Sequence, residues 1–325
     1  MRAAIYETFG NPSAVTKLGD VPQPMPGKGE VRVRMILSPI HNHDLWTTRG
    51  TYGYKPTLPA IGGTEAVGTV DAVGEGVDAV LIGKRIAVGG VQGSWAEYFN
   101  AQANTIVPVP DAIADDTAAQ LIAMPFSAIS LLDMLKAKAG DWIVQTAANG
   151  AVGKVIAALA SERGIGLINL VRRAEAVAEL TDQGMTNVIA TSNADWIDEV
   201  KSVTGPKGAV SAVDSVGGEI GAALIDVLGT NGELVIFGTA TGAPMPLNSG
   251  AVIFKEITIK GFWGAKVSAA MSGEKKGQLI GELITLAVEG KLPLPVGGIF
   301  DLADAAKAMD AAQVPGRTGK VLLHA

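Results

Sequence analysis

The segment Trp142–Gly153 is the feature that most constrains the fold of this chain. An apolar run, Trp142 to Gln145, is followed by a turn of small residues and then by the apolar positions of a helix. Small residues let backbone N–H groups approach a phosphate, and a helix N-terminus adds partial positive charge. The spacing Ala147-x-x-Gly150-x-x-Gly153 alone has little specificity in a chain with 41 Gly. Its strand–turn–helix context, however, predicts the pyrophosphate site of a dinucleotide-binding fold.

The next apolar run indicates which dinucleotide is bound. Leu167–Val171 is followed by Arg172 and Arg173, at the spacing where NAD-binding folds usually carry an acid for the ribose 2′-hydroxyl. An acid would repel a 2′-phosphate, whereas a guanidinium can bind it through two hydrogen bonds. We therefore predict NADPH rather than NADH as the cofactor. The alternative is that both arginines are solvated residues that open the next helix.

Composition excludes several classes of protein. The chain has no Cys, which excludes disulfides, thiolate catalysis and Cys-ligated metal sites. Its net charge of −6 argues against a nucleic-acid partner. The most apolar stretch, Leu121–Leu132, contains Pro125 and is too short to cross a membrane, and Met1–Glu7 lacks the apolar core of a signal peptide. We therefore expect a cytoplasmic enzyme that acts on a small molecule.

The pattern of elements divides the 325 residues into two domains. Up to about residue 115 the chain is β-rich, with alternating polarity in Val31–Ile36 and a valine-rich run in Ala66–Gly74. From residue 118 to the run Ile257–Lys260, helical and strand patterns alternate, which predicts an α/β doubly wound parallel sheet. The remaining tail is too small for a core of its own. We predict one domain from residues 1–117 and 262–325, and a dinucleotide-binding domain from residues 118–261.

The order of these parts resembles the medium-chain dehydrogenase/reductase superfamily over essentially the whole chain. Several segments are similar to its 2-enoyl thioester reductases, namely Gly50–Pro56, Leu58–Glu65, Gln145–Gly153, Ile168–Arg172, Ile253–Glu256 and Gly261–Trp263. The resemblance implies a GroES-like β-barrel domain, a Rossmann domain and a homodimer. It also implies NADPH-dependent reduction of the C=C bond of α,β-unsaturated thioesters. Quinone and enal or enone reductases share much of the pattern, and a non-enzymatic NADPH-binding structural or sensor protein is an alternative of another class.

Many members of this superfamily carry a catalytic zinc ion, so the zinc positions need to be compared. The metal is typically held by a Cys three residues before an Asp and by a His directly before a Glu. Here these positions hold His41, before Asp44, and Thr64, before Glu65. On an extended segment His41 and His43 would point to opposite faces, and no third ligand is evident. We expect no metal, with one His in the active-site wall and the other a polar surface or hydrogen-bonding residue.

Reduction of a conjugated alkene requires two aligned reactants and a hydrogen-bond donor at the enolate oxygen. The resemblance gives Tyr52 the catalytic role, the alternative being a packing tyrosine with its hydroxyl at the surface. It assigns the substrate pocket to His41, Tyr52, Met124 and Trp263. Relatives usually carry Asn at the position of Met124, which predicts a reshaped pocket or an altered substrate. The residues expected to bind the cofactor are Ser127, Asn149, Gly150, Ala151, Val152, Gly153, Arg172, Arg173, Phe237, Gly238, Thr239, Phe262, Trp263 and Lys320. For Phe262 and Trp263, simple core packing is the competing interpretation.

Overall fold

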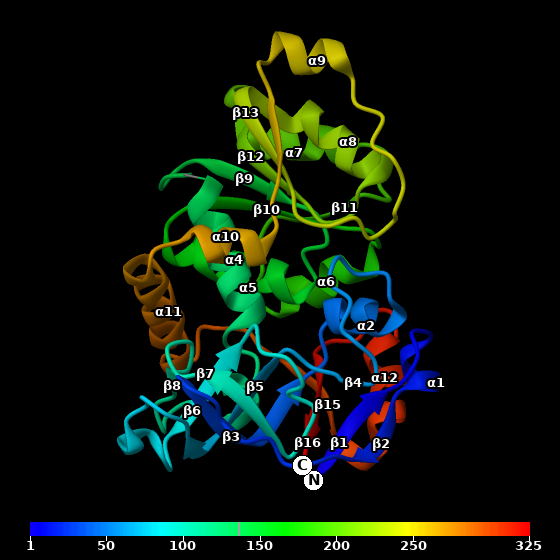
Figure 1. The fold of residues 1–325 in the computed structure, drawn as a ribbon. Helices are drawn as coiled ribbons and strands as arrows, with labels where there is room; N and C mark the ends of the chain where they lie inside the picture. Colours follow the sequence, from blue (N-terminus) through cyan, green and yellow to red (C-terminus); the bar gives the residue numbers. More distant parts are fainter. Residues whose placement is uncertain (136) are drawn as a thin grey trace. The chain divides into compact units, whose positions relative to one another are not determined.

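A computed structural model describes residues 1–135 and 137–325, which divide into two compact units (Figure 1). The first unit comprises Met1–Phe126 and Ile280–Ala325, and the second comprises Ser127–Leu279. The division falls within two helices, α4 (Ala123–Leu135) and α11 (Gly273–Val288). The sequence pattern predicts boundaries after residues 117 and 261 instead, because a helix that continues from one unit into the next leaves no break in polarity.

The first unit is built on a seven-stranded sheet of order β15-β16-β3-β5-β6-β8, with β7 pairing β3, and a three-stranded sheet of order β2-β1-β4. Its strands are β1 (Arg2–Tyr6), β2 (Lys17–Asp20), β3 (Glu30–Pro39), β4 (Ala60–Ile61), β5 (Glu65–Val73), β6 (Arg85–Gly89), β7 (Tyr98–Gln102), β8 (Val107–Pro108), β15 (Val296–Asp301) and β16 (Lys320–His324). Its shorter helices are α1 (Pro12–Val15), α2 (Asn42–Arg49), α3 (Asp115–Ala118) and α12 (Ala305–Gln313). The long strand β3 buries Val31, Val33 and Met35 at alternate positions, as a period of two requires. The C-terminal strand β16 pairs with the end of β3, so the tail belongs to this unit.

The second unit is a six-stranded parallel sheet of order β11-β10-β9-β12-β13-β14. Its strands are β9 (Trp142–Gln145), β10 (Gly166–Val171), β11 (Val188–Ala190), β12 (Ala209–Asp214), β13 (Leu228–Ile236) and β14 (Thr258–Gly261). Its helices also include α5 (Ala151–Glu162), α6 (Glu175–Asp182), α7 (Trp196–Thr204), α8 (Gly218–Val227), α9 (Ser249–Phe254) and α10 (Gly264–Ala270). In Figure 1, α7 and α8 lie above this sheet and α5 lies below it. The order confirms the predicted doubly wound parallel sheet.

The strand order also shows where a ligand of the second unit would bind. The chain runs from β9 outward to β10 and β11, then crosses back to β12 on the other side of β9. Ligands of such sheets bind at the carboxyl ends of the strands, where the order reverses. The turn after β9 lies at this point. Among the helices that the structure describes, none is long and apolar enough to cross a membrane.

Candidate active site

The turn between β9 and α5 has the geometry of a phosphate cradle. Gly150 is the N-cap of α5, and no side chain of the described residues caps this end, so the N–H groups of the first turn can bind an anion. Ala147 adopts a φ of 53°, which folds the chain back from the strand. A Cβ on Gly153 would lie 2.7 Å from the carbonyl oxygen of Ala148 and 2.8 Å from its Cα. The close approach of helix to turn therefore requires glycine at position 153.

Buried amides tie this turn to the two strands beside it. Gln145 Nε2 donates to the carbonyl oxygen of Gly153 at 2.9 Å and to Asn169 Oδ1 at 2.7 Å. Asn169 Nδ2 in turn donates to the carbonyl oxygen of Thr186 at 2.9 Å. The first turn of α5 is thus fixed to β9 and β10, although the sequence analysis assigned no role to either amide.

A second buried link joins the carboxyl ends of β9 and β12. Asp214 accepts from Thr146 Oγ1 at 2.9 Å and from the backbone N–H groups of Val216 and Gly217 at 3.0 and 2.8 Å. Thr146 Oγ1 also accepts from the N–H of Ser215 at 2.8 Å. These bonds hold the loop after β12 against the turn after β9, where the strand order reverses.

The other residues predicted for the second unit lie at the ends of its strands. Arg172 and Arg173 are exposed directly after β10, and Phe237–Thr239 follows β13. Phe262 is buried, with its ring centre 5.6 Å from that of Phe237, so it packs as a core residue. Trp263 is 48% exposed, and Lys266 Nζ lies 5.0 Å from the centre of its ring. Ser127 lies beside Gly264, where a Cβ would come within 3.2 Å of its Oγ.

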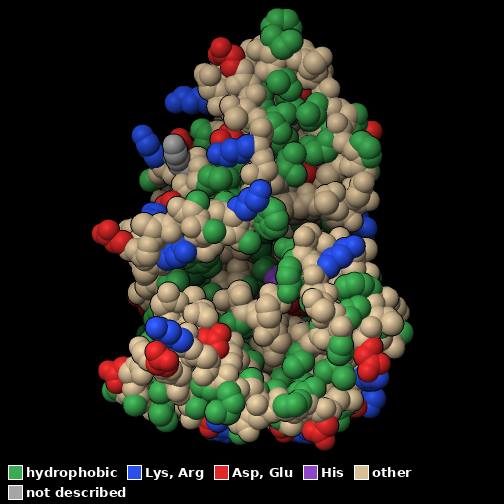
Figure 2. All heavy atoms as spheres, in the orientation of Figure 1, with side chains coloured by type: hydrophobic (Ala, Val, Ile, Leu, Met, Phe, Trp, Pro, Cys, Tyr) green, Lys and Arg blue, Asp and Glu red, His purple; other side chains and the backbone are tan. Residues whose placement is uncertain are grey.

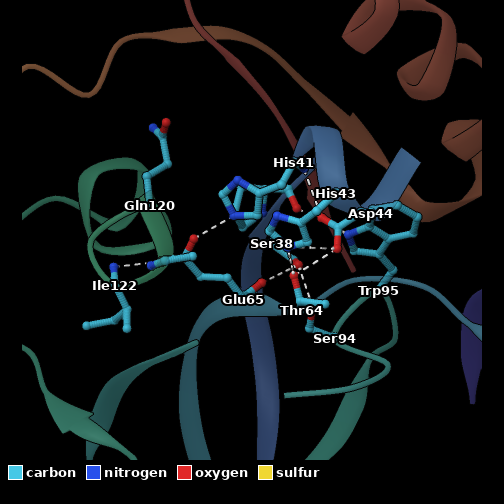
Figure 3. A network of polar contacts seen from close by, with 12 residues as sticks. Ser38, His41, His43, Asp44, Thr64, Glu65, Ser94, Trp95, Gln120 and Ile122 are labelled. Atoms are coloured by element: carbon cyan, nitrogen blue, oxygen red, sulfur yellow. Dashed lines mark hydrogen bonds and ion pairs between the residues drawn. The ribbon is translucent and has the colours of Figure 1, made fainter. Parts of the chain in front are cut away.

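In the first unit, His41 and Glu65 form a buried pair (Figure 3). Their side chains are 1% and 0% exposed, and His41 Nε2 lies 2.7 Å from Glu65 Oε2. Glu65 Oε1 accepts from the backbone N–H groups of Ile122 and Ala123 at 2.6 and 2.7 Å. Burial raises the pKa of Glu65 to about 7, against the effect of these two hydrogen bonds. Burial and the positive charge of Lys320 lower the pKa of His41 well below its ordinary value, so this imidazole is neutral.

Lys320, predicted to contact the cofactor, lies beside this pair at the start of β16. It is buried, and burial together with Arg317 lowers the pKa of Lys320 to about 8. The negative charges of Asp44 and Glu65 act in the opposite direction. The ammonium group of Lys320 thus interacts electrostatically with the buried side chains of Asp44 and Glu65.

The expectation that His41 and His43 lie on opposite faces of an extended segment is wrong, because residues two apart in a strand share a face and because the segment is not extended here. Helix α2 begins directly after His41, because Asp44, its third residue, accepts from the His41 N–H at 2.9 Å and turns the chain into the helix. The two imidazole rings are stacked, with centres 5.0 Å apart and planes 16° apart. The side chain of His43 is 22% exposed, whereas His41 is buried.

His43 belongs to a directed chain of hydrogen bonds that the sequence analysis did not predict. Thr64 Oγ1 donates to Asp44 Oδ1 at 2.8 Å and lies 2.8 Å from His43 Nε2. Since the hydroxyl proton of Thr64 is directed to Asp44, His43 Nε2 must be the donor toward Thr64. The order is therefore His43 to Thr64 to Asp44 (Figure 3).

The side chains at the two zinc positions do not suit a catalytic zinc ion. At the two positions where relatives hold zinc, His41 Nε2 is bonded to Glu65 and Thr64 Oγ1 to His43 and Asp44. Zinc sites are built from thiolates, imidazoles and carboxylates, and a threonine hydroxyl is not among the usual ligands. Over the residues that the structure describes, no three His, Cys, Asp or Glu side chains are placed to share a metal ion.

Tyr52 follows the end of α2, where Gly50 adopts a left-handed φ of 75°. The ring centre of Tyr52 lies 5.9 Å from that of His43 and 6.4 Å from that of Trp46. The side chain is partly exposed, and within residues 1–135 and 137–325 its hydroxyl makes no hydrogen bond. Met124 follows directly on Ala123, whose N–H binds Glu65, so it lies at the edge of the same network.

Comparisons of the sequence and of the structure with known proteins both find dehydrogenases and reductases. Residues 27–111 match the alcohol dehydrogenase GroES-like domain, and residues 151–276 match the zinc-binding dehydrogenase family. The chain is 31% identical to a mitochondrial enoyl-[acyl-carrier-protein] reductase of Xenopus tropicalis, over 99% of this chain and 95% of that protein.

Among solved structures, a putative NADPH:quinone reductase from Bacillus thuringiensis is similar with a TM-score of 0.92 at 32% identity, over 100% of this chain and 98% of that one. The quinone oxidoreductase of Escherichia coli in complex with NADPH is similar with a TM-score of 0.89 at 25% identity, over the whole of both chains. The predicted GroES-like and Rossmann folds are thereby confirmed.

Proposed function

Because the chain belongs to the medium-chain dehydrogenase/reductase superfamily, as a relative of its enoyl and quinone reductases, we propose that it reduces the C=C bond of 2-enoyl thioesters with NADPH. The observation that carries this proposal is that hydrogen-bonded side chains occupy both zinc positions, with Tyr52 beside them against His43. A zinc alcohol dehydrogenase needs a Lewis acid at the substrate oxygen, but of the two zinc positions His41 is bonded to Glu65, and Thr64 to His43 and Asp44. Reduction of a conjugated alkene needs only orientation and a hydrogen-bond donor.

The second unit fits the cofactor through its β9–α5 turn. We assign the pyrophosphate to Gly150–Gly153 and the N-terminus of α5, and the 2′-phosphate to Arg172 and Arg173. Support comes from the Gly153 backbone, which leaves no room for a Cβ, and from the E. coli relative that holds NADPH. When bound, NADPH supplies the hydride that reduces the substrate. Phe237–Thr239 after β13 and Ser127 are the further proposed contacts.

In this proposal Tyr52 acts on the substrate oxygen. Negative charge collects on the thioester oxygen when the β-carbon is reduced, and a neutral phenol can donate a hydrogen bond to it. The hydroxyl of Tyr52 has no partner in the described chain that would compete for this proton. The α-carbon must also receive a proton, which requires a second donor.

A quinone reductase is the second candidate, favoured by the likeness to the B. thuringiensis and E. coli structures. It would use the same cofactor turn and the same donor at oxygen. The difference lies in whether the site accepts the long carrier arm of a thioester.

The test is oxidation of NADPH in the presence of crotonyl-CoA, beside a simple quinone and with NADH as control. We expect turnover of the thioester with NADPH, lowered about 10²–10⁴-fold by Tyr52→Phe, which keeps the ring and removes the hydroxyl. Activity on the quinone alone would replace the thioester by the second candidate. A Tyr52→Phe variant as fast as the wild type would remove Tyr52 from the donor role.

Exchange of both Arg172 and Arg173 for alanine is expected to weaken NADPH binding roughly 10–100-fold, since two exposed guanidinium groups would no longer face the 2′-phosphate. NADH lacks that phosphate, so its dissociation constant should be unchanged. Both constants can be measured by titration of nicotinamide fluorescence. Equal weakening for the two cofactors would show that the arginines support the fold rather than select the phosphate.

The homodimer implied by the family resemblance stays a prediction. Two features of the second unit support it. β14 is an edge strand of the sheet, and Ile253 and Phe254 on α9 are largely exposed. Figure 2 shows hydrophobic side chains at the tip of the unit that α9 forms. A second copy of the chain could cover both features.

A further inference from the structure

We propose that His43 is the acid that delivers the proton to the α-carbon of the substrate, and that Thr64 and Asp44 position it. This inference rests on the proposed reduction of a conjugated double bond, which leaves one proton to be supplied. The sequence did not show which of His41 and His43 has which role. The structure separates the two imidazoles by burial and by hydrogen bonding.

His41 is unsuited to the task. Its side chain is 1% exposed, Nε2 is bonded to Glu65, and Nδ1 is a buried atom without a partner in the described chain. Its lowered pKa keeps it neutral, so it has no ready proton to give. His43 stacks on it from the more accessible side, with about a fifth of its side chain exposed and the Tyr52 ring 5.9 Å away.

The hydrogen-bond chain sets the orientation of the His43 ring. Asp44 is buried, and its two oxygens accept from the His41 N–H and from Thr64 Oγ1, so it is a fixed acceptor. Thr64 therefore presents a lone pair to His43, and Nε2 of the imidazole must carry a proton. The remaining nitrogen, Nδ1, is the one that can exchange a proton with a substrate.

Charged and titratable groups surround His43. Asp44 Oδ1 lies 3.5 Å from Nε2. The stacked His41 is neutral and adds no charge. The groups that face this network from the other elements are Glu65 on β5, Tyr52 after α2, and Lys320 and Arg317 in the C-terminal tail.

The proposed step balances as follows. The β-carbon has received the hydride, and the enolate oxygen is held by Tyr52. The enolate electron pair forms a bond from the α-carbon to the proton on Nδ1, and the electrons of the broken N–H bond stay on nitrogen. His43 is left as the neutral ring that still donates from Nε2 to Thr64, and its exposed edge regains a proton from water. The substrate thereby gains two electrons as hydride and one proton.

The experiment compares His43→Gln, Thr64→Val and the matched control Thr64→Ser by the pH dependence of kcat. The wild type should lose activity as the pH rises, because the imidazolium is the active form. We expect His43→Gln to lower kcat roughly 10²–10³-fold and to abolish that decline. Thr64→Val should lower kcat about tenfold, since the acceptor that orients His43 Nε2 is lost. Thr64→Ser keeps the hydroxyl and should behave as the wild type.

Binding of NADPH, measured by fluorescence, serves as the readout that does not depend on turnover, and it should be unchanged in all three variants. A His43→Gln enzyme with kcat within about twofold of the wild type and the same pH profile would overturn the inference, while thioester reduction by the wild type would still stand. Turnover of the quinone alone would overturn the proposed delivery to an α-carbon, because reduction of a quinone protonates oxygen. Failure on both substrate classes would remove the proposed function and the proton donor together.

Discussion

Replacement of Glu65 by alanine is expected to lower the free energy of unfolding by about 3–5 kcal/mol. The side chain is completely buried, and three donors or acceptors depend on it: His41 Nε2 and the N–H groups of Ile122 and Ala123. Alanine leaves all three without a partner, and a cavity beside them. Urea unfolding followed by circular dichroism measures the loss. A loss below about 1 kcal/mol would mean that water replaces the carboxyl group, and that this network does not stabilise the first unit.

Glu65→Gln is the matched control, because its amide can satisfy the same three groups. The oxygen can accept from Ile122 and Ala123, and the NH₂ group can donate to the neutral ring of His41. Its stability should therefore stay within about 1 kcal/mol of the wild type at about pH 5, where the glutamate is protonated.

The two proteins should diverge as the pH rises. The pKa of Glu65 is about 7 in the folded protein against an ordinary value of 4.5, so the folded state binds more protons than the unfolded state between these values. This contribution to wild-type stability is complete below about pH 4.5, is lost as the pH rises through about 7, and is then constant. Glutamine does not titrate. Glu65→Gln should therefore be more stable than the wild type at about pH 8, by about 1–3 kcal/mol. A constant difference across the pH range would show that Glu65 does not carry the shifted pKa.

The Rossmann unit could be predicted from sequence because its signals are periodic and local. Apolar runs of strand length alternate with helical patterns, and Gly150 and Gly153 mark the turn after β9. Strand β11 has no such signal, because its three residues are too few to establish a period. In the first unit β15 is equally hard to predict, because Gly297 and Gly298 interrupt its apolar pattern.

Helix α2 shows why the active-site geometry could not be predicted to the same degree. Its eight residues are mostly polar, so no apolar face indicates a helix. The available signal is the capping interaction of Asp44, three residues after His41. An extended segment would place the two imidazoles one after the other along a single face, whereas the start of the helix stacks them. The predicted placement of the two histidines therefore depended on whether this short segment was interpreted as extended or as helical.

The links that build the site join residues far apart in sequence. Thr64 lies 20 residues after Asp44, and Asp214 lies 68 residues after Thr146. No local pattern connects such pairs, because each joins two segments that meet only in the folded chain. The resemblance singled out Asp44 and Glu65 as neighbours of ligand positions, but their partners had to come from the structure.

Gly153→Ala should weaken NADPH binding roughly 10–100-fold, the second large effect that we expect. The added Cβ would lie within 3 Å of the carbonyl oxygen, Cα and carbonyl carbon of Ala148, all backbone atoms that cannot rotate away. The turn must open, which displaces the N-terminus of α5 and strains the bond from Gln145 to the Gly153 carbonyl. We also expect the free energy of unfolding to fall by about 1–3 kcal/mol.

Gly277→Ala is the control for this substitution, since it adds the same methyl group on the exposed surface of α11, with nothing within 4 Å. It should leave the dissociation constant for NADPH unchanged and stabilise the helix by up to about 1 kcal/mol. Fluorescence titration and urea unfolding of both variants separate the effects. If Gly153→Ala lost stability but bound NADPH as tightly as the wild type, the close packing on Ala148 would serve the fold alone. The pyrophosphate would then have to be held elsewhere, away from the N-terminus of α5.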